Sequence, residues 1–159
     1  GVKLGRRVVF MAKEELFRLW LPAYFVRGFG SFPVYKSRRD LKAIRLANRV
    51  LACGGALAMF PEGRRSKNGH MERAYNGSAL IALHNDVPIL PVGITGTEVI
   101  RGTGWMLHRP RVTMTIGEPF RLPKSGSRVT REEVAGYTDM IMKRIAGLLP
   151  QRYRGRYGG

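Results

Sequence analysis

The sequence contains a single cysteine and few acidic residues, and each shortage excludes a class of protein. Because Cys53 is the only cysteine, an internal disulfide and a multi-cysteine zinc or iron–sulfur site are excluded. No run reaches the roughly 18 uninterrupted apolar residues that a membrane-spanning helix needs. The 11 Asp and Glu stand against 28 Lys and Arg, which gives a net charge of +17 at pH 7. This imbalance indicates a polyanionic partner: a nucleic acid, an anionic membrane surface or a phosphorylated small molecule.

The length and the apolar content favour one folded domain. The chain has 159 residues, of which 44% are hydrophobic and 9% aromatic, enough for a packed core without disulfides or metal. We predict that this domain covers residues 1–150. Residues 151–159 are rich in Arg, Gly and Tyr and are predicted to form a frayed basic tail.

The apolar pattern alternates along the chain between that of strands and that of helices. Short apolar runs predict strands over residues 8–12, 32–35, 56–60, 89–94 and 111–116. Apolar residues at helical spacing predict helices over residues 16–25, 40–53, 78–85 and 130–148. Strands that alternate with helices indicate an α/β domain with a mostly parallel sheet flanked by helices.

Two of the predicted helices carry clear end signals. The glycine pair at 54–55 is predicted to end the helix that opens at Asp40. The residues expected on the buried face of that helix are Leu41, Ile44, Ala47 and Leu51. The last helix is predicted to begin with a capping box, because Thr130 is followed three positions on by Glu133. Its inward residues are expected to be Val134, Tyr137, Ile141, Ile145 and Leu148.

The strongest functional signal lies in residues 60–66, which read F-P-E-G-R-R-S and follow a predicted buried strand. Ligands of open α/β sheets collect at the carboxyl ends of the strands. Gly63 lets the backbone approach a ligand closely, and an arginine such as Arg65 presents a fork of donors that matches phosphate oxygens. Glu62 is suited either to hold a guanidinium or to accept a hydrogen bond from a substrate hydroxyl. The alternative is an ordinary charged turn in solvent.

A second basic loop follows the predicted strand at residues 32–35. It carries Lys36, Arg38 and Arg39 next to a predicted helix start, where main-chain N–H groups and the helix dipole favour an anion. Two such loops at one edge of a sheet would form a single anion-binding pocket. The alternative is that Arg38 and Arg39 only solubilise the entry to the helix.

Three segments in order along the chain resemble the blocks of the glycerolipid acyltransferase family, to which the 1-acylglycerol-3-phosphate acyltransferases belong. Residues 60–66 are similar to the family's F-P-E-G-x-R-S signature. Residues 30–36, which read G-S-F-P-V-Y-K, are similar to its G-x-F-x-V-x-R block. Residues 87–92, which read V-P-I-L-P-V, are similar to its V-P-I-x-P-V block.

The resemblance implies an enzyme of phospholipid biosynthesis. Such an enzyme transfers a fatty acyl group from acyl-CoA or acyl carrier protein to the hydroxyl of a lysophospholipid such as 1-acylglycerol-3-phosphate. The resemblance also implies that Glu62, Gly63 and Arg65 bind the acceptor phosphate. Lys36 stands where the family has arginine, with Arg38 nearby, and a lysine replaces the donor fork with a point charge. The acyl thioester is a co-substrate, and no cofactor or metal is expected.

The family's catalytic motif, H-x-x-x-x-D, is missing from this sequence. In the family its histidine is the general base that takes the proton of the acceptor hydroxyl, and its aspartate orients that histidine. None of His70, His84 and His108 has an aspartate five positions on, so all three are predicted to be structural or solvated. In the family the motif precedes the strand that resembles residues 8–12. We therefore expect it upstream of Gly1, and expect this chain alone to be an inactive fragment.

A membrane surface is the other expected partner. Residues 16–32 interleave Trp20, Tyr24 and other aromatics with Arg18 and Arg27, a composition suited to a segment among lipid headgroups. Residues 104–107, which read G-W-M-L, are a second candidate. With the net charge they predict association with an anionic membrane on its cytoplasmic face. The alternative for residues 16–32 is a buried helix packed on the sheet.

Two other functions fit the charge. A nucleic-acid-binding module would use the arginines and the tail at residues 151–159, which is similar to segments that bind RNA. The aromatics form no obvious stacking platform, however, so nucleic acid is not the expected partner. A noncatalytic lipid-binding relative would require that the complete protein lack the His/Asp pair.

Overall fold

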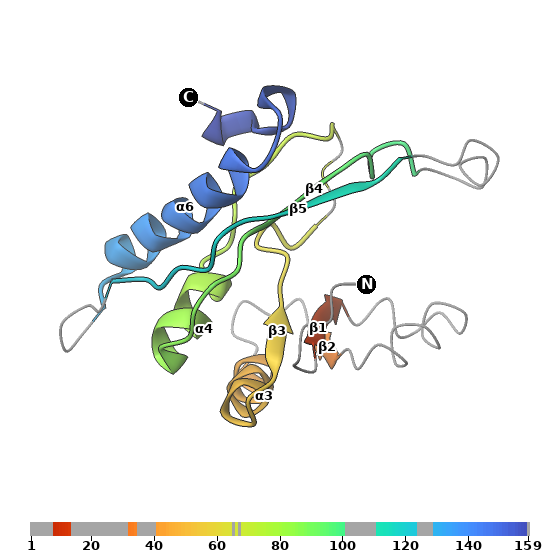
Figure 1. Ribbon diagram of the computed structural model, residues 1–159. Coiled ribbons are helices and arrows are strands. Elements are labelled where there is room, and N and C mark those ends of the chain that lie inside the picture. The colour runs from red at the N-terminus through yellow and green to blue at the C-terminus, as the bar shows by residue number, and fades with distance from the viewer. Residues whose placement is uncertain are drawn as a thin grey trace. The chain divides into compact units, whose positions relative to one another are not determined.

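The chain forms two compact units, Gly1–Phe60 and Pro61–Gly159 (Figure 1). The structure, a computed structural model, describes residues 8–13, 32–34, 41–64, 66, 68–100, 111–123 and 129–158. The helix predicted over residues 16–25 and the aromatic segment at 104–107 lie outside these ranges. The chain has an α/β fold, with helices and small sheets.

The first unit contains a three-stranded parallel sheet in the order β2-β1-β3. The central strand β1 (Val8–Lys13) pairs with β2 (Phe32–Val34) through its second half and with β3 (Ala56–Ala58) through its first half. The first two strand predictions are thus confirmed. The third strand is shorter and less buried than predicted, and Phe60 beyond it is 62% exposed. It is short because only Val8 to Phe10 of β1 face β3 in register.

Helix α3 (Leu41–Ala52) lies against β3 in the same unit. Ala47, which was predicted to face inward, is fully buried, and Ala43 is buried beside it although it was not predicted. Ile44, also predicted to face inward, is 38% exposed, so the buried face is rotated from Ile44 toward Ala43. The predicted end is confirmed: the N–H of Gly55 donates to the carbonyl of Val50 at 3.0 Å, and Gly54 has a left-handed φ of 75°. This is the geometry of a glycine-terminated helix.

The second unit contains an antiparallel pair, β4 (Val92–Thr95) and β5 (Thr113–Ile116). A bridge between Ile89 and Phe120 extends the pairing, with main-chain hydrogen bonds of 2.7 and 2.9 Å. β5 falls within its predicted run, and β4 starts within its run and ends one residue beyond it. The mostly parallel sheet holds only for the strands of the first unit. Apolar periodicity marks where a strand lies and carries no information on the direction in which it pairs.

Two helices pack together in the second unit, α4 (Gly77–Asn85) and α6 (Arg131–Gly147), as Figure 1 shows. The predicted capping box is confirmed. Thr130 Oγ1 accepts from the N–H of Glu133 at 3.2 Å, and Glu133 Oε2 accepts from the N–H of Thr130 at 2.7 Å. The core between the helices consists of Ala79, Ala82, Leu122, Val134 and Ile141.

The chain end is ordered, so the prediction of a frayed tail is wrong. Residues of the tail form two 3₁₀ turns, η1 (Gln151–Tyr153) and η2 (Gly155–Tyr157). Tyr153 is only 8% exposed. It joins a second core cluster with Met71, Met142, Ala146 and Leu149. Burial of the aromatic ring offsets the conformational entropy that the tail loses when it becomes ordered.

Within the described part of the chain, no helix is long and apolar enough to cross a membrane.

Candidate functional site

The structure describes two of the five predicted phosphate-binding residues, Glu62 and Gly63. Lys36, Arg38 and Arg65 lie outside the described residues. The single anion-binding pocket formed by two basic loops therefore stays a prediction. The structure shows which contacts hold the loop that carries Glu62 and Gly63.

The loop that begins at Pro61 is closed by bonds to residues eight to fourteen positions further along the chain. The N–H of Tyr75 donates to the carbonyl of Pro61 at 2.9 Å. The N–H of Glu72 donates to Glu62 Oε2 at 3.1 Å. The guanidinium of Arg64 forms an ion pair with the carboxylate of Glu72. Glu62 and Arg64 are thus both anchored at Glu72, one on its main chain and the other on its side chain.

The Glu62 carboxyl is half-buried, and its environment changes its acidity. Burial raises the pKa of Glu62, and the nearby Glu72 carboxylate raises it further. The N–H of Glu72 and the charge of Arg64 oppose this shift, but the net effect on the pKa of Glu62 is upward. A partly desolvated carboxylate that is oriented by a main-chain donor is suited to accept a hydrogen bond from a ligand or to hold a cation.

Gly63 is required by the shape of the loop. Its φ is 63°, in the left-handed region that residues with a Cβ adopt at a cost. A Cβ at this position would lie 3.1 Å from Cε2 and 3.2 Å from Cδ2 of Tyr75. The ring of Tyr75, which is 70% exposed, therefore covers Gly63 from one side.

The two histidines that the structure describes have ordinary surface positions. His70 is exposed, and its Nδ1 donates to the main-chain carbonyl of Arg152 at 2.6 Å. His84 is exposed in the last turn of α4. His108 lies outside the described residues. Among the described residues, no three His, Cys, Asp or Glu side chains gather as metal ligands would.

Sequence reasoning missed Glu72 as a partner of the signature. Glu72 is one of only 11 acidic residues in a strongly basic chain, and it lies shortly after two arginines. An isolated acid in such a segment was the available signal. Tyr153 and the turns around it were missed as well, because their contacts with residues 70 and 71 span most of the second unit's sequence.

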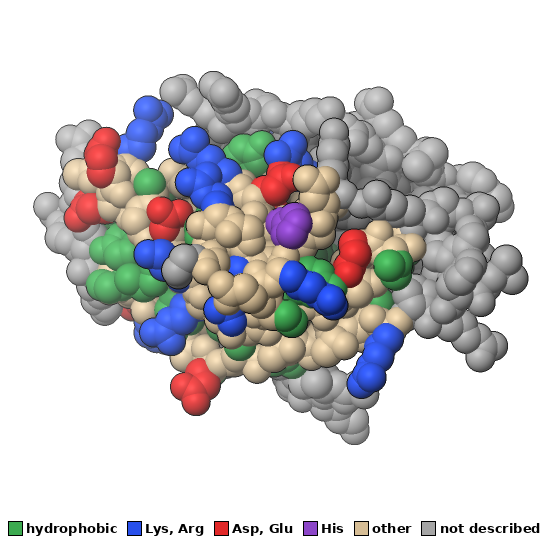
Figure 2. All heavy atoms as spheres, turned by 90° about the horizontal axis from the view of Figure 1, so that it is seen from above, with side chains coloured by type: hydrophobic (Ala, Val, Ile, Leu, Met, Phe, Trp, Pro, Cys, Tyr) green, Lys and Arg blue, Asp and Glu red, His purple; other side chains and the backbone are tan. Residues whose placement is uncertain are grey.

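The charged groups of the described surface are mixed. Figure 2 shows Lys and Arg side chains spread over the visible face with acidic side chains between them.

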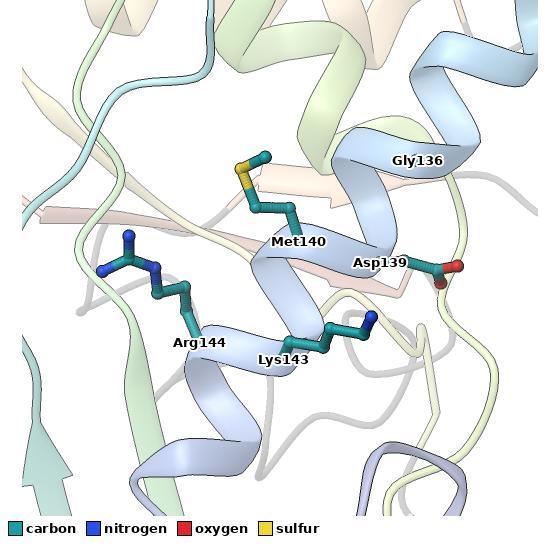
Figure 3. A pocket seen from close by; sticks show the side chains of 5 residues that line it. All are labelled: Gly136, Asp139, Met140, Lys143 and Arg144. Carbon is teal, nitrogen blue, oxygen red and sulfur yellow. The ribbon is translucent and has the colours of Figure 1, made fainter. Parts of the chain in front are cut away.

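A depression of about 520 Å³ lies on α6 and is lined by Gly136, Asp139, Met140, Lys143 and Arg144 (Figure 3). All five residues belong to one helix and none to the signature. The depression is therefore an open hollow on the surface of one helix.

Comparison with known proteins shows which family the chain resembles. The family model described as Acyltransferase matches residues 2–95. A 1-acyl-sn-glycerol-3-phosphate acyltransferase of Streptococcus pneumoniae is 35% identical over 72% of this chain and 41% of its own length. The Bacillus subtilis protein of the same name is 25% identical over 91% of this chain and 70% of its own length.

A solved structure is similar as well. The 1-acyl-sn-glycerophosphate acyltransferase of Thermotoga maritima superposes with a TM-score of 0.61 and 28% sequence identity, over 89% of this chain and 56% of that one. The chain thus spans 41% of the Streptococcus relative and 56% of the Thermotoga protein. Because the family model covers more than half of its residues and the relatives carry glycerolipid acyltransferase names, the chain belongs to the glycerolipid acyltransferase family.

Proposed function

We propose that this chain forms the acceptor-binding part of an O-acyltransferase of phospholipid biosynthesis. The enzyme would transfer a fatty acyl group from acyl-CoA or acyl carrier protein to the free hydroxyl of a lysophospholipid such as 1-acylglycerol-3-phosphate. Membership of the family and the activity for which the relatives are named support this reaction.

The observation that carries the proposal is the anchoring of Glu62 and Arg64 at Glu72. Arg64 is occupied by an ion pair within the loop, so we assign it to holding the shape of the loop. The next residue, Arg65, is then the arginine that binds the acceptor phosphate, together with Lys36 and Arg38. A guanidinium binds two phosphate oxygens through parallel hydrogen bonds, and the left-handed φ of Gly63 gives the loop its turn just before the two arginines.

The chemical step that we propose follows the resemblance to the family. A histidine oriented by an aspartate takes the proton of the acceptor hydroxyl, and the oxygen attacks the thioester carbonyl carbon. The C–S bond breaks, an ester forms, and the thiolate of the donor leaves and receives the proton. We expect the His/Asp pair to be encoded upstream of Gly1, so the 159-residue chain alone is expected to be inactive.

The test begins with the coding sequence upstream of the codon for Gly1. We expect an in-frame H-x-x-x-x-D motif there, and acyl transfer to 1-acylglycerol-3-phosphate by the extended protein. Replacing Arg65→Ala in that protein should raise the KM for this acceptor at least about tenfold, because a charge-assisted bond is lost. The KM for acyl-CoA should stay unchanged. An equal loss toward both substrates would contradict phosphate binding by Arg65, and a protein without the motif would instead be a noncatalytic lipid-binding relative.

We also propose that the protein works at an anionic membrane, on its cytoplasmic face. The net charge of +17 and the arginine-flanked aromatics around Trp20 support this. In a vesicle-sedimentation assay, binding should increase with the fraction of anionic lipid and decrease as salt is added. Binding that depends on neither would exclude this location.

A further inference from the structure

The two turns at the chain end lie against the segment that anchors the signature loop. The carbonyl of Tyr153 accepts from the N–H of Met71 at 2.8 Å, and the carbonyl of Arg152 accepts from Nδ1 of His70 at 2.6 Å. Met71 and Tyr153 are both buried in one core cluster. The hydroxyl of Tyr153 also donates to Oε1 of Glu98 at 2.5 Å. The turns are thus attached to the rest of the second unit by main-chain, side-chain and apolar contacts.

The contact with Met71 is close enough to require glycine in the second turn. Gly155 has a φ of 49°, and a Cβ there would lie 2.3 Å from the carbonyl oxygen of Met71. That distance is shorter than any tolerated contact, so an alanine would push the turn away from Met71. Gly147, at the end of α6, offers a matched contrast because a Cβ there would meet no atom within 4 Å.

The next residue after Met71 is Glu72, which holds both Glu62 and Arg64. A displacement of Met71 is therefore passed directly to the N–H group that orients the Glu62 carboxylate. The chain-end turns and Glu98 lie outside the signature at residues 60–66. Arg152 and Tyr153 nevertheless bind residues 70 and 71 directly, and Glu98 binds Tyr153.

We infer that Tyr153 and Gly155 are positioning residues for acceptor binding: the chain-end turns hold Met71 and Glu72, and Glu72 holds Glu62 and Arg64 in the geometry that receives the acceptor phosphate. This inference rests on the proposed function. It gives residues 151–158 a role in holding the signature loop, in place of that of a solvated basic tail. Tyr153 and Gly155 act through Glu72 and do not touch the acceptor.

The experiment compares the 159-residue chain with Gly155→Ala and with the control Gly147→Ala. The first readout is hydrogen–deuterium exchange of the Glu72 amide by NMR. The second is the Kd for a short-chain 1-acylglycerol-3-phosphate and for the matching monoacylglycerol, which lacks the phosphate. In Gly155→Ala we expect the Glu72 amide to exchange about tenfold faster and the Kd for the phosphorylated ligand to rise about tenfold. Gly147→Ala should change neither readout.

The two readouts separate this inference from the proposed function. A Glu72 amide that exchanges at the same rate in Gly155→Ala, or an unchanged Kd for the phosphorylated ligand, would overturn the inference. If the original chain binds both ligands equally, the proposed phosphate site fails, whereas faster Glu72 exchange in Gly155→Ala would still support the mechanical link. If Gly155→Ala does not fold, Tyr153→Phe replaces it, because the ring stays packed while the bond to Glu98 is lost. Exchange of the Glu72 amide and the Kd for the phosphorylated ligand are then measured for Tyr153→Phe, with the same outcomes for the inference.

Discussion

The carboxylate of Glu62 accepts a hydrogen bond of 3.1 Å from the N–H of Glu72, while the Glu72 carboxylate pairs with Arg64. This reciprocal arrangement closes the loop that carries the family signature. It separates the roles of two adjacent arginines, since Arg64 is committed to the loop and Arg65 is assigned to the ligand. The loop is therefore held in place by residues of the second unit itself.

Replacing Glu62→Gln should remove the part of the pH dependence of stability that comes from ionisation of Glu62. The folded-state pKa of Glu62 is raised, so its protonated form is favoured in the folded chain. Its contribution is fully present below the unfolded pKa and is lost as the pH rises through the folded pKa. Glutamine keeps an oxygen for the Glu72 N–H and carries no charge. Urea unfolding should therefore show Glu62→Gln gaining stability relative to the original chain between about pH 4 and pH 7.

The exposed Glu118→Gln is the control for loss of one negative charge. Acceptor binding by Glu62→Gln should fall although the fold is retained. A large drop in melting temperature at pH 7 would instead show that Glu62 is structural.

Replacing Glu98→Gln should have the opposite pH dependence. The hydrogen bond from the Tyr153 hydroxyl lowers the pKa of Glu98 in the folded chain. The stability that this bond adds is present above the unfolded pKa and is lost as the pH falls through the folded pKa. Glu98→Gln should therefore be less stable than the original chain at pH 7, and the difference should shrink toward pH 3. A difference of the same size at both values would rule out ionised Glu98 as the cause.

Replacing Gly63→Ala should destabilise the second unit by about 1–2 kcal/mol, because alanine is strained at a left-handed φ and also meets the Tyr75 ring. Gly77→Ala is the matched control. A Cβ on Gly77, in the first turn of α4, meets nothing within 4 Å and should stabilise the chain by about 0.5 kcal/mol. Chemical unfolding of both variants measures the contrast. Equal stabilities for the two variants would show that the turn at Gly63 relaxes freely.

Replacing Thr130→Ala should cost about 1 kcal/mol, because the first turn of α6 loses its side-chain cap on the N–H of Glu133. Thr130→Ser keeps a hydroxyl at the same position and should retain most of the stability. The two variants can be compared by thermal unfolding followed by circular dichroism. If serine and alanine lower the melting temperature equally, the capping box does not stabilise α6.

Features set by residues close in sequence were predictable from the sequence. The capping box at Thr130 and the glycine end at Gly54 depend on partners three to five residues away, and both were predicted correctly. The signature loop was located for the same reason, because its residues are contiguous.

Features set by distant contacts were not predictable in this way. The order of the tail depends on the contacts of Tyr153 with Met71 and Glu98. The antiparallel direction of β5 depends on its pairing with β4, about twenty residues earlier in the chain. On α3, the burial of Ala47 was predicted correctly, but its neighbour on the buried face is the small Ala43 rather than the more hydrophobic Ile44. The link between Glu62 and Glu72 was missed because two acidic residues are joined through a main-chain N–H, which no side-chain pattern records.

The most direct test of phosphate recognition is calorimetric titration of the 159-residue chain with a short-chain 1-acylglycerol-3-phosphate and with the matching monoacylglycerol. The original chain should prefer the phosphorylated ligand by at least about tenfold. Arg65→Ala should abolish that preference, whereas Arg49→Ala, which removes a positive charge from the exposed side of α3, should keep it. Equal affinity of the original chain for both ligands, or an unchanged preference in Arg65→Ala, would contradict the assignment of the F-P-E-G-R-R-S loop to the acceptor phosphate.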